Sequence, residues 1–308
     1  MAKVGFIGLG LMGTGFTKRL AAMGHKVIGY DVDPDKLRAA RDWGVEPAGS
    51  PAEVAAATDL IGVCVTTSYA VEAVICGEAG LTSGRLDGKT VFDVSTTEME
   101  VTHRVAAAVA AAGGAFVDAP VSGGPGAAET GTLAILAGGD AATVEAIRPV
   151  LEKFGQLTHM GATGAGQATK LVNQVLCLTN YCVVAEALRL AEAYGVDANK
   201  IPAALAPGLA NSTVLQTVYP RMVERDFAPR GYARQLLKDL ELLMETTRAH
   251  HLAMPMTAQA TTLFRMLVAG GDSELDGAAI LKLLPEPKAN VTPSLTADLR
   301  FQEPPSAS

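Results

Sequence analysis

Apolar residues in the first half of the chain fall into short runs separated by stretches of helical period. The apolar runs predict strands at residues 3–8, 26–30, 60–65, 90–94, 115–118, 132–137 and 156–160. The stretches between them predict helices at residues 14–23, 33–43, 51–57, 97–112 and 141–154. Strands that alternate with helices at this spacing indicate a doubly wound parallel sheet. We therefore predict an N-terminal α/β domain over residues 1–161.

The stretch at residues 161–194 has a different pattern. Three glycines in its first six residues predict a tight loop, and a helix of roughly eight turns without a proline follows. Apolar residues such as Leu171, Val175 and Leu178 point in every direction around that helix. A helix that is apolar all round is typically buried on all sides. We therefore expect residues 162–194 to form a long buried helix between two lobes, or between subunits.

Helical patterns also cover the next part of the chain. They lie at residues 200–209, 213–224, 233–250 and 256–268. We expect these helices to form an all-helical C-terminal domain over residues 195–284, with the long helix as its connection to the first domain. Residues 285–308 are rich in proline and poor in apolar residues, and this composition predicts a loose tail.

A glycine-rich motif joins the first predicted strand to the first predicted helix. Its residues are Gly8, Leu9, Gly10, Leu11, Met12 and Gly13. Between a strand and a helix, such glycines permit a sharp turn and the approach of a pyrophosphate to the helix N-terminus. Asp31 ends the second strand, 23 residues after Gly8, near the spacing of about 20 for a carboxylate that binds the adenosine ribose. A turn without a ligand is the alternative, but the context and Asp31 favour a Rossmann-type dinucleotide site.

Three further positions belong to the predicted cofactor site. Val65 and Thr66 stand at the end of the third long apolar run, and Thr96 follows the fourth. In open α/β sheets, ligands bind at the carboxyl ends of the strands. Because the carboxylate of Asp31 would repel a 2′-phosphate and no arginine stands at Val32 or Asp33, we predict NAD, not NADP.

A second group of residues suggests a carboxylate-bearing substrate. Ser122, Gly123 and Gly124 follow the strand at residues 115–118, so a hydroxyl and several backbone N–H groups are exposed together. Such a nest suits a carboxylate. An ordinary turn rich in glycine and proline is the alternative reading.

Lys170 and Asn173 are polar exceptions near the start of the long helix. Their spacing of three residues puts them on one helix face. A buried lysine is costly unless it has a partner or a chemical role. A lysine whose stem packs on the helix while its amine reaches solvent is the alternative.

Composition narrows the class of protein. The 308 residues carry a formal charge of −7 without a basic run, so we expect no nucleic-acid partner. The first residues lead directly into a strand and do not resemble a secretory leader, and no long run free of polar groups predicts a membrane span. The cysteines form no CxxC pair, so we expect reduced thiols, no metal site and a cytoplasmic location. These thiols are Cys64, Cys76, Cys177 and Cys182.

With these motifs in order, the sequence resembles the β-hydroxyacid dehydrogenase family over residues 3–284. The resemblance is carried by the motifs at residues 8–13, 118–124, 164–173 and 238–240. It implies that Lys170 is the general acid/base and that Asn173 orients the substrate. It also implies that Ser122, Gly123 and Gly124 hold the substrate carboxylate. Thr96 and Lys238 would lie beside the cofactor.

The branches of this family leave two substrates open. Gln174 and the segment 208–216 resemble tartronate semialdehyde (2-hydroxy-3-oxopropionate) reductases, whereas Asp31 resembles NAD-preferring members such as 3-hydroxyisobutyrate dehydrogenases. The segment beginning at Val65 departs from the usual Met-Leu-Pro. We expect hydride transfer between a nicotinamide and a small 3-hydroxy acid or its semialdehyde.

Two other functions remain as alternatives. An imine reductase with this fold usually replaces the catalytic lysine, and a non-catalytic NAD-binding regulator needs neither Lys170 nor the carboxylate nest. The histidines are rival bases without a motif around them: His25, His103, His159, His250 and His251. Because a single helical domain is unsuited to cover every face of the long helix, we also expect a homodimer or homotetramer.

Overall fold

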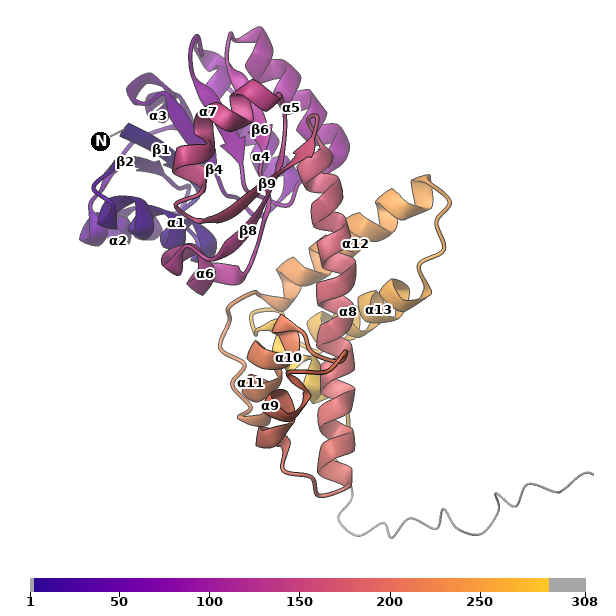
Figure 1. Ribbon diagram of the computed structural model, residues 1–308. Helices are drawn as coiled ribbons and strands as arrows, with labels where there is room; N and C mark the ends of the chain where they lie inside the picture. The colour runs from indigo at the N-terminus through magenta and orange to yellow at the C-terminus, as the bar shows by residue number, and fades with distance from the viewer. Residues whose placement is uncertain (1–2, 288–308) are drawn as a thin grey trace, which may run out of the picture.

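The computed structural model describes residues 3–287, so the tail predicted at 285–308 lies almost wholly outside the described residues. An N-terminal α/β domain and a helical C-terminal domain are joined by the long helix α8 (Ala165–Ala193) (Figure 1). The strands are β1 (Lys3–Ile7), β2 (Lys26–Tyr30), β3 (Val45–Pro47), β4 (Leu60–Val63), β5 (Thr90–Asp93), β6 (Ala115–Asp118), β7 (Val121–Ser122), β8 (Leu133–Gly138) and β9 (Gly155–Gly161).

The sheet is parallel over six of these strands and then reverses. The parallel part has the order β3-β2-β1-β4-β5-β6, which is the order of dinucleotide-binding sheets. β8 pairs antiparallel with β6 and β7, and β9 runs parallel to β8. The sequence pattern predicted a parallel sheet throughout. The residues between β6 and β8 instead form β7 and a short helix that packs on α1, so no helix crosses the sheet to return the chain in the parallel direction.

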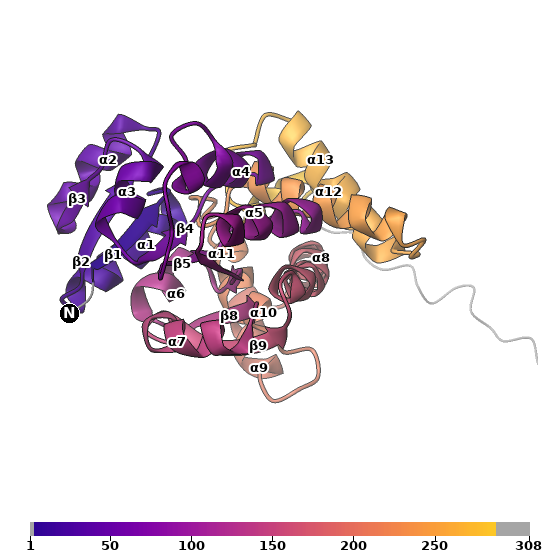
Figure 2. The same cartoon turned by 90° about the horizontal axis from the view of Figure 1, so that it is seen from above.

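Helices cover both faces of the sheet. The helices of this domain are α1 (Leu11–Ala22), α2 (Pro34–Ala40), α3 (Pro51–Ala57), α4 (Ser68–Cys76), α5 (Met99–Ala111), α6 (Gly124–Thr130) and α7 (Ala141–Leu151). Figure 2 shows α4 and α5 on one side of the sheet and α6 and α7 on the other. Two separate apolar clusters result: one holds Phe16 and Ile147 and the other holds Val71 and Val105. The sheet is therefore doubly wound, as the alternating pattern predicts. The strands β3 and β7 and the helices α4 and α6 were not predicted. The two strands, of three and two residues, are too short to show a period.

The helical domain packs along the C-terminal part of α8. Its helices are α9 (Ile201–Leu205), α10 (Thr213–Thr217), α11 (Tyr219–Val223), α12 (Ala233–Ala249) and α13 (Pro255–Ala269), followed by a 3₁₀ segment (Gly277–Leu283). Leu188, Leu240 and Phe264 meet in its core. The single helix predicted at 213–224 is split into α10 and α11, where Pro220 lacks the N–H that a continuous helix requires.

One face of α8 remains open in the single chain. Val172, Leu176, Val183 and Leu190 expose 59, 68, 54 and 61% of their surface. The expectation that α8 is buried on all sides is therefore wrong for one chain, because both domains pack on the other faces of the helix. By length and apolar composition α8 could also cross a membrane. Because α8 connects the two domains and carries the buried residue Lys170, we interpret it as a core helix of the folded chain and not as a membrane span.

Candidate functional site

The glycine-rich motif forms the turn between β1 and α1. Gly8 has φ +92°, and a Cβ there would collide with the carbonyl oxygen of Cys64. A Cβ at Gly13 would likewise collide with the carbonyl of Gly8, whereas a Cβ at Gly10 would meet no atom within 4 Å. Gly10 is also the N-cap of α1, and it has no side chain to accept hydrogen bonds from the free N–H groups in the first turn of the helix. The space at Gly10 and the uncapped helix start fit a pyrophosphate, with Leu11 and Met12 in the first turn.

Asp31 lies beside this turn because β1 and β2 are adjacent parallel strands. Its Oδ2 accepts a hydrogen bond of 2.7 Å from Leu9 N, and its Oδ1 accepts one of 2.8 Å from Asp33 N. Each carboxylate oxygen has a further lone pair, so both can still accept a ribose hydroxyl. Val32 is 82% exposed and brings no positive charge to this position.

The other predicted cofactor residues lie at the carboxyl ends of β4 and β5. Val65 N donates to Ser95 Oγ over 3.0 Å, which ties the two strand ends together. Thr66 is exposed, and Thr96 is partly buried. Lys238 of α12 donates from Nζ to Thr96 O over 2.9 Å, so the helical domain reaches the cofactor edge of the sheet at this point.

The predicted carboxylate nest begins in β7. Ser122 ends that strand, and Gly123 and Gly124 follow with φ of +136° and +76°. A Cβ at Gly124 would meet no atom within 4 Å, so this backbone faces open space. A ligand can therefore reach the backbone of this loop.

Lys170 contacts the strand that carries this nest. It is only 8% exposed, and its Nζ donates to the carbonyl oxygen of Val121 over 2.8 Å. Val121 directly precedes Ser122. A side chain from α8 and the strand that leads into the Ser122–Gly124 loop are thus brought together.

Asn173 does not bond to Lys170 in this structure. Its Nδ2 donates to Gln174 Oε1 over 2.8 Å, and Gln174 Nε2 donates to Asp239 Oδ2 over 2.5 Å. Asp239 is 7% exposed, and its Oδ1 lies 2.9 Å from Nζ of Lys238. Sequence reasoning assigned no role to Asp239, although it belongs to the motif that contains Lys238.

Burial and nearby charges shift the pKa of the groups at this site. Burial lowers the pKa of Lys170 below 10.5, the charges of Asp239 and Cys177 oppose that shift, and Lys238 adds to it. The Cys177 thiol shares this helix face, and burial raises its pKa. A buried lysine with a lowered pKa can accept a proton nearer to neutral pH than a lysine in water.

Two buried carboxylates lie behind the site and were also missed. Burial raises the pKa of Asp93 and of Asp118 to about 6. Asp93 accepts hydrogen bonds from Ser95 and Thr97, and Asp118 accepts hydrogen bonds from the start of α8. Asp118 opens the substrate motif in the sequence. Its partners lie more than forty residues away, so no local pattern could have identified its contacts.

The rival bases have other environments. His159 places Nε2 2.8 Å from Gly161 O and 3.0 Å from Gly139 O, so it is bonded to the backbone. His103, His250 and His251 are exposed. Among residues 3–287, no group of three His, Cys, Asp or Glu side chains has the geometry of a metal site.

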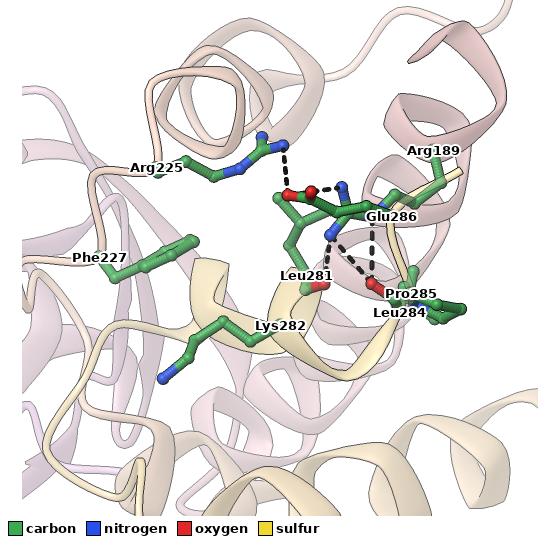
Figure 3. A pocket seen from close by; sticks show the side chains of 8 residues that line it. All are labelled: Arg189, Arg225, Phe227, Leu281, Lys282, Leu284, Pro285 and Glu286. Carbon is green, nitrogen blue, oxygen red and sulfur yellow. Dashed lines mark hydrogen bonds and ion pairs between the residues drawn. The ribbon is translucent and has the colours of Figure 1, made fainter. Parts of the chain in front are cut away.

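A separate pocket of about 450 Å³ lies in the helical domain (Figure 3). Arg189 and Arg225 point into it, and both bond to Glu192 at 2.7 and 2.8 Å. Glu286 lies 3.9 and 3.8 Å from the same two arginines. Their charges are thus matched within the chain, and the pocket contains none of the site residues described above.

Comparison with known proteins shows the family of this chain. The model of the NAD binding domain of 6-phosphogluconate dehydrogenase matches residues 3–177, and that of the NAD-binding domain of NADP-dependent 3-hydroxyisobutyrate dehydrogenase matches residues 164–284. The chain is 38% identical to 2-hydroxy-3-oxopropionate reductase of Escherichia coli, over 92% of this chain and 97% of that protein. It is 33% identical to a probable 3-hydroxyisobutyrate dehydrogenase-like protein of Arabidopsis thaliana, over 92% and 87%.

A solved structure gives the same result for the fold. 3-Hydroxyisobutyrate dehydrogenase of Mycobacterium tuberculosis, in a complex with L-serine, superimposes with a TM-score of 0.80 at 30% identity. The match covers 92% of this chain and 99% of that one. The two family models together span both domains, and the relatives are similar over nearly their whole length. The chain therefore belongs to the β-hydroxyacid dehydrogenase family of nicotinamide-dependent oxidoreductases.

Proposed function

We propose that the chain interconverts a small 3-hydroxy acid of the 3-hydroxyisobutyrate type and its semialdehyde, with Lys170 as general acid/base. One observation carries the proposal: the buried amine of Lys170 lies 2.8 Å from Val121 O, directly beside the Ser122–Gly124 nest. An alcohol whose carboxylate binds the nest would place its hydroxyl within reach of that amine. A cofactor-binding regulator needs no such arrangement, and the lysine also argues against an imine reductase.

The chemistry requires both parts of the site. Oxidation of the alcohol removes a hydride from carbon and a proton from oxygen, and the bound nicotinamide supplies the hydride acceptor. Neutral Lys170 accepts the proton, and in the reverse direction its ammonium returns the proton to the carbonyl oxygen. Burial favours the neutral amine, which is why a lysine can act as a base here. Asn173, one turn further along α8, orients the substrate.

The carboxylate requirement can be tested directly. We expect kcat/KM for a 3-hydroxy acid to exceed that for its methyl ester by roughly 10–150-fold, the value of a hydrogen bond to a charged group of about 1.5–3 kcal/mol. Steady-state rates for the acid, its ester and its amide give this ratio. Equal values for the charged and neutral compounds would exclude the nest as a carboxylate site.

A second substrate has specific support. Gln174 stands beside Asn173 and bonds to Asp239, and the similarity to 2-hydroxy-3-oxopropionate reductase is 38% identity over 285 residues. Tartronate semialdehyde is therefore the alternative substrate. A panel of 3-hydroxyisobutyrate, glycerate, both semialdehydes and a cyclic imine separates the candidates by kcat/KM. Binding of cofactor without turnover of any compound would favour the regulator instead.

NAD is the cofactor that we propose. Asp31 presents a carboxylate where the adenosine ribose is expected, and the neighbouring Val32 is exposed and neutral. Facing a 2′-phosphate, the same charge would be repelled.

A second copy of this chain is the partner that we propose for the open face of α8. Val172, Leu176, Val183 and Leu190 form an apolar stripe that is uncovered in one chain, and closed symmetric dimers and tetramers are the common assemblies of soluble proteins. Light scattering at micromolar concentration should give a multiple of 31.7 kDa; the monomer mass would reject the assembly. We propose a cytoplasmic location, in keeping with the four free thiols.

A further inference from the structure

The start of α8 is held by a carboxylate from another part of the fold. Its N-cap residue is Gly164, which has φ +93° and no side chain to bond the free N–H groups of the first turn. Asp118, at the end of β6, is fully buried and supplies the missing acceptors. Its Oδ1 accepts from Gly164 N over 2.7 Å, and its Oδ2 accepts from Gln167 N over 2.9 Å. Both oxygens are thus used to cap the helix on which Lys170 stands.

Gln167 joins the same helical turn to the end of β5. It is 1% exposed, its Nε2 donates to Ser95 O over 2.9 Å, and its Oε1 accepts from Thr97 N over 3.1 Å. These two backbone groups flank Thr96, which is expected beside the cofactor. Asp93 holds the same segment from below, because it accepts from Ser95 N over 2.9 Å and from Thr97 Oγ1 over 2.8 Å.

The start of α8 lies very close to the ends of the strands. A Cβ at Gly166 would lie 2.8 Å from the carbonyl oxygen of Asp118, and one at Gly138 would lie 2.6 Å from Asp118 Oδ1. Both distances are shorter than contacts that real side chains make. The two glycines therefore let α8 approach the strand ends closely enough for the carboxylate of Asp118 to reach its first turn.

Lys170 follows Gln167 by three residues, which is nearly one helical turn. Its amine bonds to Val121, which in turn follows Asp118 by three residues. The same two elements, α8 and the segment after β6, therefore carry both the helix anchor and the lysine contact. A change in the first contact must move the second.

We propose that Asp118 and Gln167 are positioning residues for Lys170: they fix the first turn of α8 against the ends of β5 and β6, so that the amine is held beside the carboxylate nest. This inference rests on the proposed role of Lys170. A displacement of about 1 Å at a reacting group can cost roughly 100-fold in rate. The anchor therefore acts on kcat, with little effect on the cofactor turn near Gly10.

Protonation of the anchor gives a readout that a purely structural role would not share. Burial raises the pKa of Asp118 to about 6, and the charge of Asp93 contributes. The titratable groups around this pair are Lys238 from α12, Cys64 after β4 and, beside Gly164, His103 from α5. When Asp118 is protonated, one of its two oxygens becomes a hydroxyl that faces a backbone N–H group of α8 and no longer accepts its hydrogen bond as a carboxylate does. In the reduction direction Lys170 acts in its protonated form, so a fall of kcat below about pH 6 does not report the lysine. Burial raises the pKa of Asp93 to about 6 as well, so the limb belongs to Asp118 only if it changes in Asp118→Asn.

The test compares Asp118→Asn and Gln167→Met with the wild type in the reduction direction. We expect kcat to fall about 10–100-fold in each variant. The affinity for NADH, measured by fluorescence titration, should stay within about threefold of the wild type. In Asp118→Asn, the acid limb of the pH profile of kcat should shift. Asp140→Ala is the control, because Asp140 caps α7 through Thr143 N at 2.9 Å and its side chain bonds to none of the site residues. Its kcat should stay at the wild-type value.

A double-mutant cycle with Lys170→Met separates the two proposals. If Asp118 acts through Lys170, Asp118→Asn costs little further kcat in the Lys170→Met background. Full additivity, or a kcat above half of wild type in Asp118→Asn, overturns the positioning role and leaves the proposed function intact. Wild-type kcat in Lys170→Met overturns the proposed function, and with it any action of Asp118 through the lysine. If Asp118→Asn does not fold, Gln167→Met and its double-mutant cycle with Lys170→Met decide.

Discussion

Buried charges occur in both domains, but they are arranged in opposite ways. In the helical domain, Arg221 is 6% exposed and Asp276 is 1% exposed, and Arg221 Nη1 lies 3.0 Å from Asp276 Oδ1. Asp226 pairs with Arg221 Nε at 3.1 Å. The second oxygen of Asp276 accepts from the N–H groups of Arg230 and Gly231. Every charge in this cluster has a partner of opposite sign or a full set of hydrogen bonds.

At the site, three buried charged groups are not matched in this way, although Asp239 pairs with Lys238. Lys170 bonds to a backbone carbonyl, and Asp93 and Asp118 accept only from backbone N–H groups and a hydroxyl. None of these three forms an ion pair within 4 Å among residues 3–287. The pKa of the lysine is lowered, and the pKa values of the two carboxyls are raised to about 6. The comparison indicates that the paired charges of the helical domain stabilise the fold. The unpaired groups at the site have shifted pKa values and can exchange protons near neutral pH.

The largest effect that we expect comes from removing the unpaired amine at the site. Lys170→Met should lower kcat by about 10²–10⁴-fold, the usual contribution of a positioned acid/base, while NADH affinity stays nearly unchanged. Steady-state rates and a fluorescence titration measure the two quantities. Lys200→Met is the control, because that lysine is 82% exposed in the helical domain. A variant at position 170 that keeps more than a tenth of wild-type kcat would show that another group moves the proton.

The structural cluster should respond in stability instead. Arg221→Met leaves Asp276 charged, buried and without its cation, so the free energy of unfolding should fall by about 3–5 kcal/mol. Denaturant unfolding at fixed protein concentration measures this loss. Arg104→Met removes an exposed pair with Glu72 at 3.0 Å and should cost at most about 1 kcal/mol. Equal losses in the two variants, or a large loss of kcat in folded Arg221→Met, would contradict the division of roles.

Cofactor choice should change with a single partly exposed charge. A repulsion of about 2–3 kcal/mol between Asp31 and a 2′-phosphate corresponds to roughly 30–150-fold discrimination in kcat/KM. The wild type should therefore prefer NAD by at least about tenfold, and the double variant Asp31→Asn/Val32→Arg should lose or reverse this preference. A wild type that prefers NADP would disprove the role of Asp31 and favour the tartronate semialdehyde substrate.

The last prediction concerns the dependence of stability on pH. The ordinary pKa of an aspartate is 3.8, and in the folded chain the pKa of Asp118 is about 6, so the folded state binds this proton more tightly than the unfolded state. The contribution of Asp118 to stability must then decrease as pH rises from about 4 to about 6. Unfolding of wild type and Asp118→Asn across this range measures it, because asparagine does not titrate. A wild-type advantage that grows with pH would have the wrong sign.

Much of the fold follows from local patterns in the sequence. Alternating apolar runs predict the strands of the doubly wound sheet, and the glycines at 8–13 with Asp31 predict the turn that the structure places between β1, β2 and α1. The apolar stretch after Gly164 predicts α8, and the lone lysine in it predicts a buried amine at Lys170. These features depend on periods of two or 3.6 residues and on turn chemistry, which neighbouring residues determine.

Tertiary structure decided the features that depend on distant contacts. The reversal of β8 and β9 and the open stripe on α8 follow from how layers pack, and no short window of sequence contains that information. Asp118 caps a helix 46 residues away, and Asp239 reaches Gln174 from α12, 65 residues further along the chain. A buried carboxylate takes whatever donors the surrounding elements bring to it. The sequence by itself therefore determined the elements and their chemical groups, while only the packed chain decided which buried charges are paired.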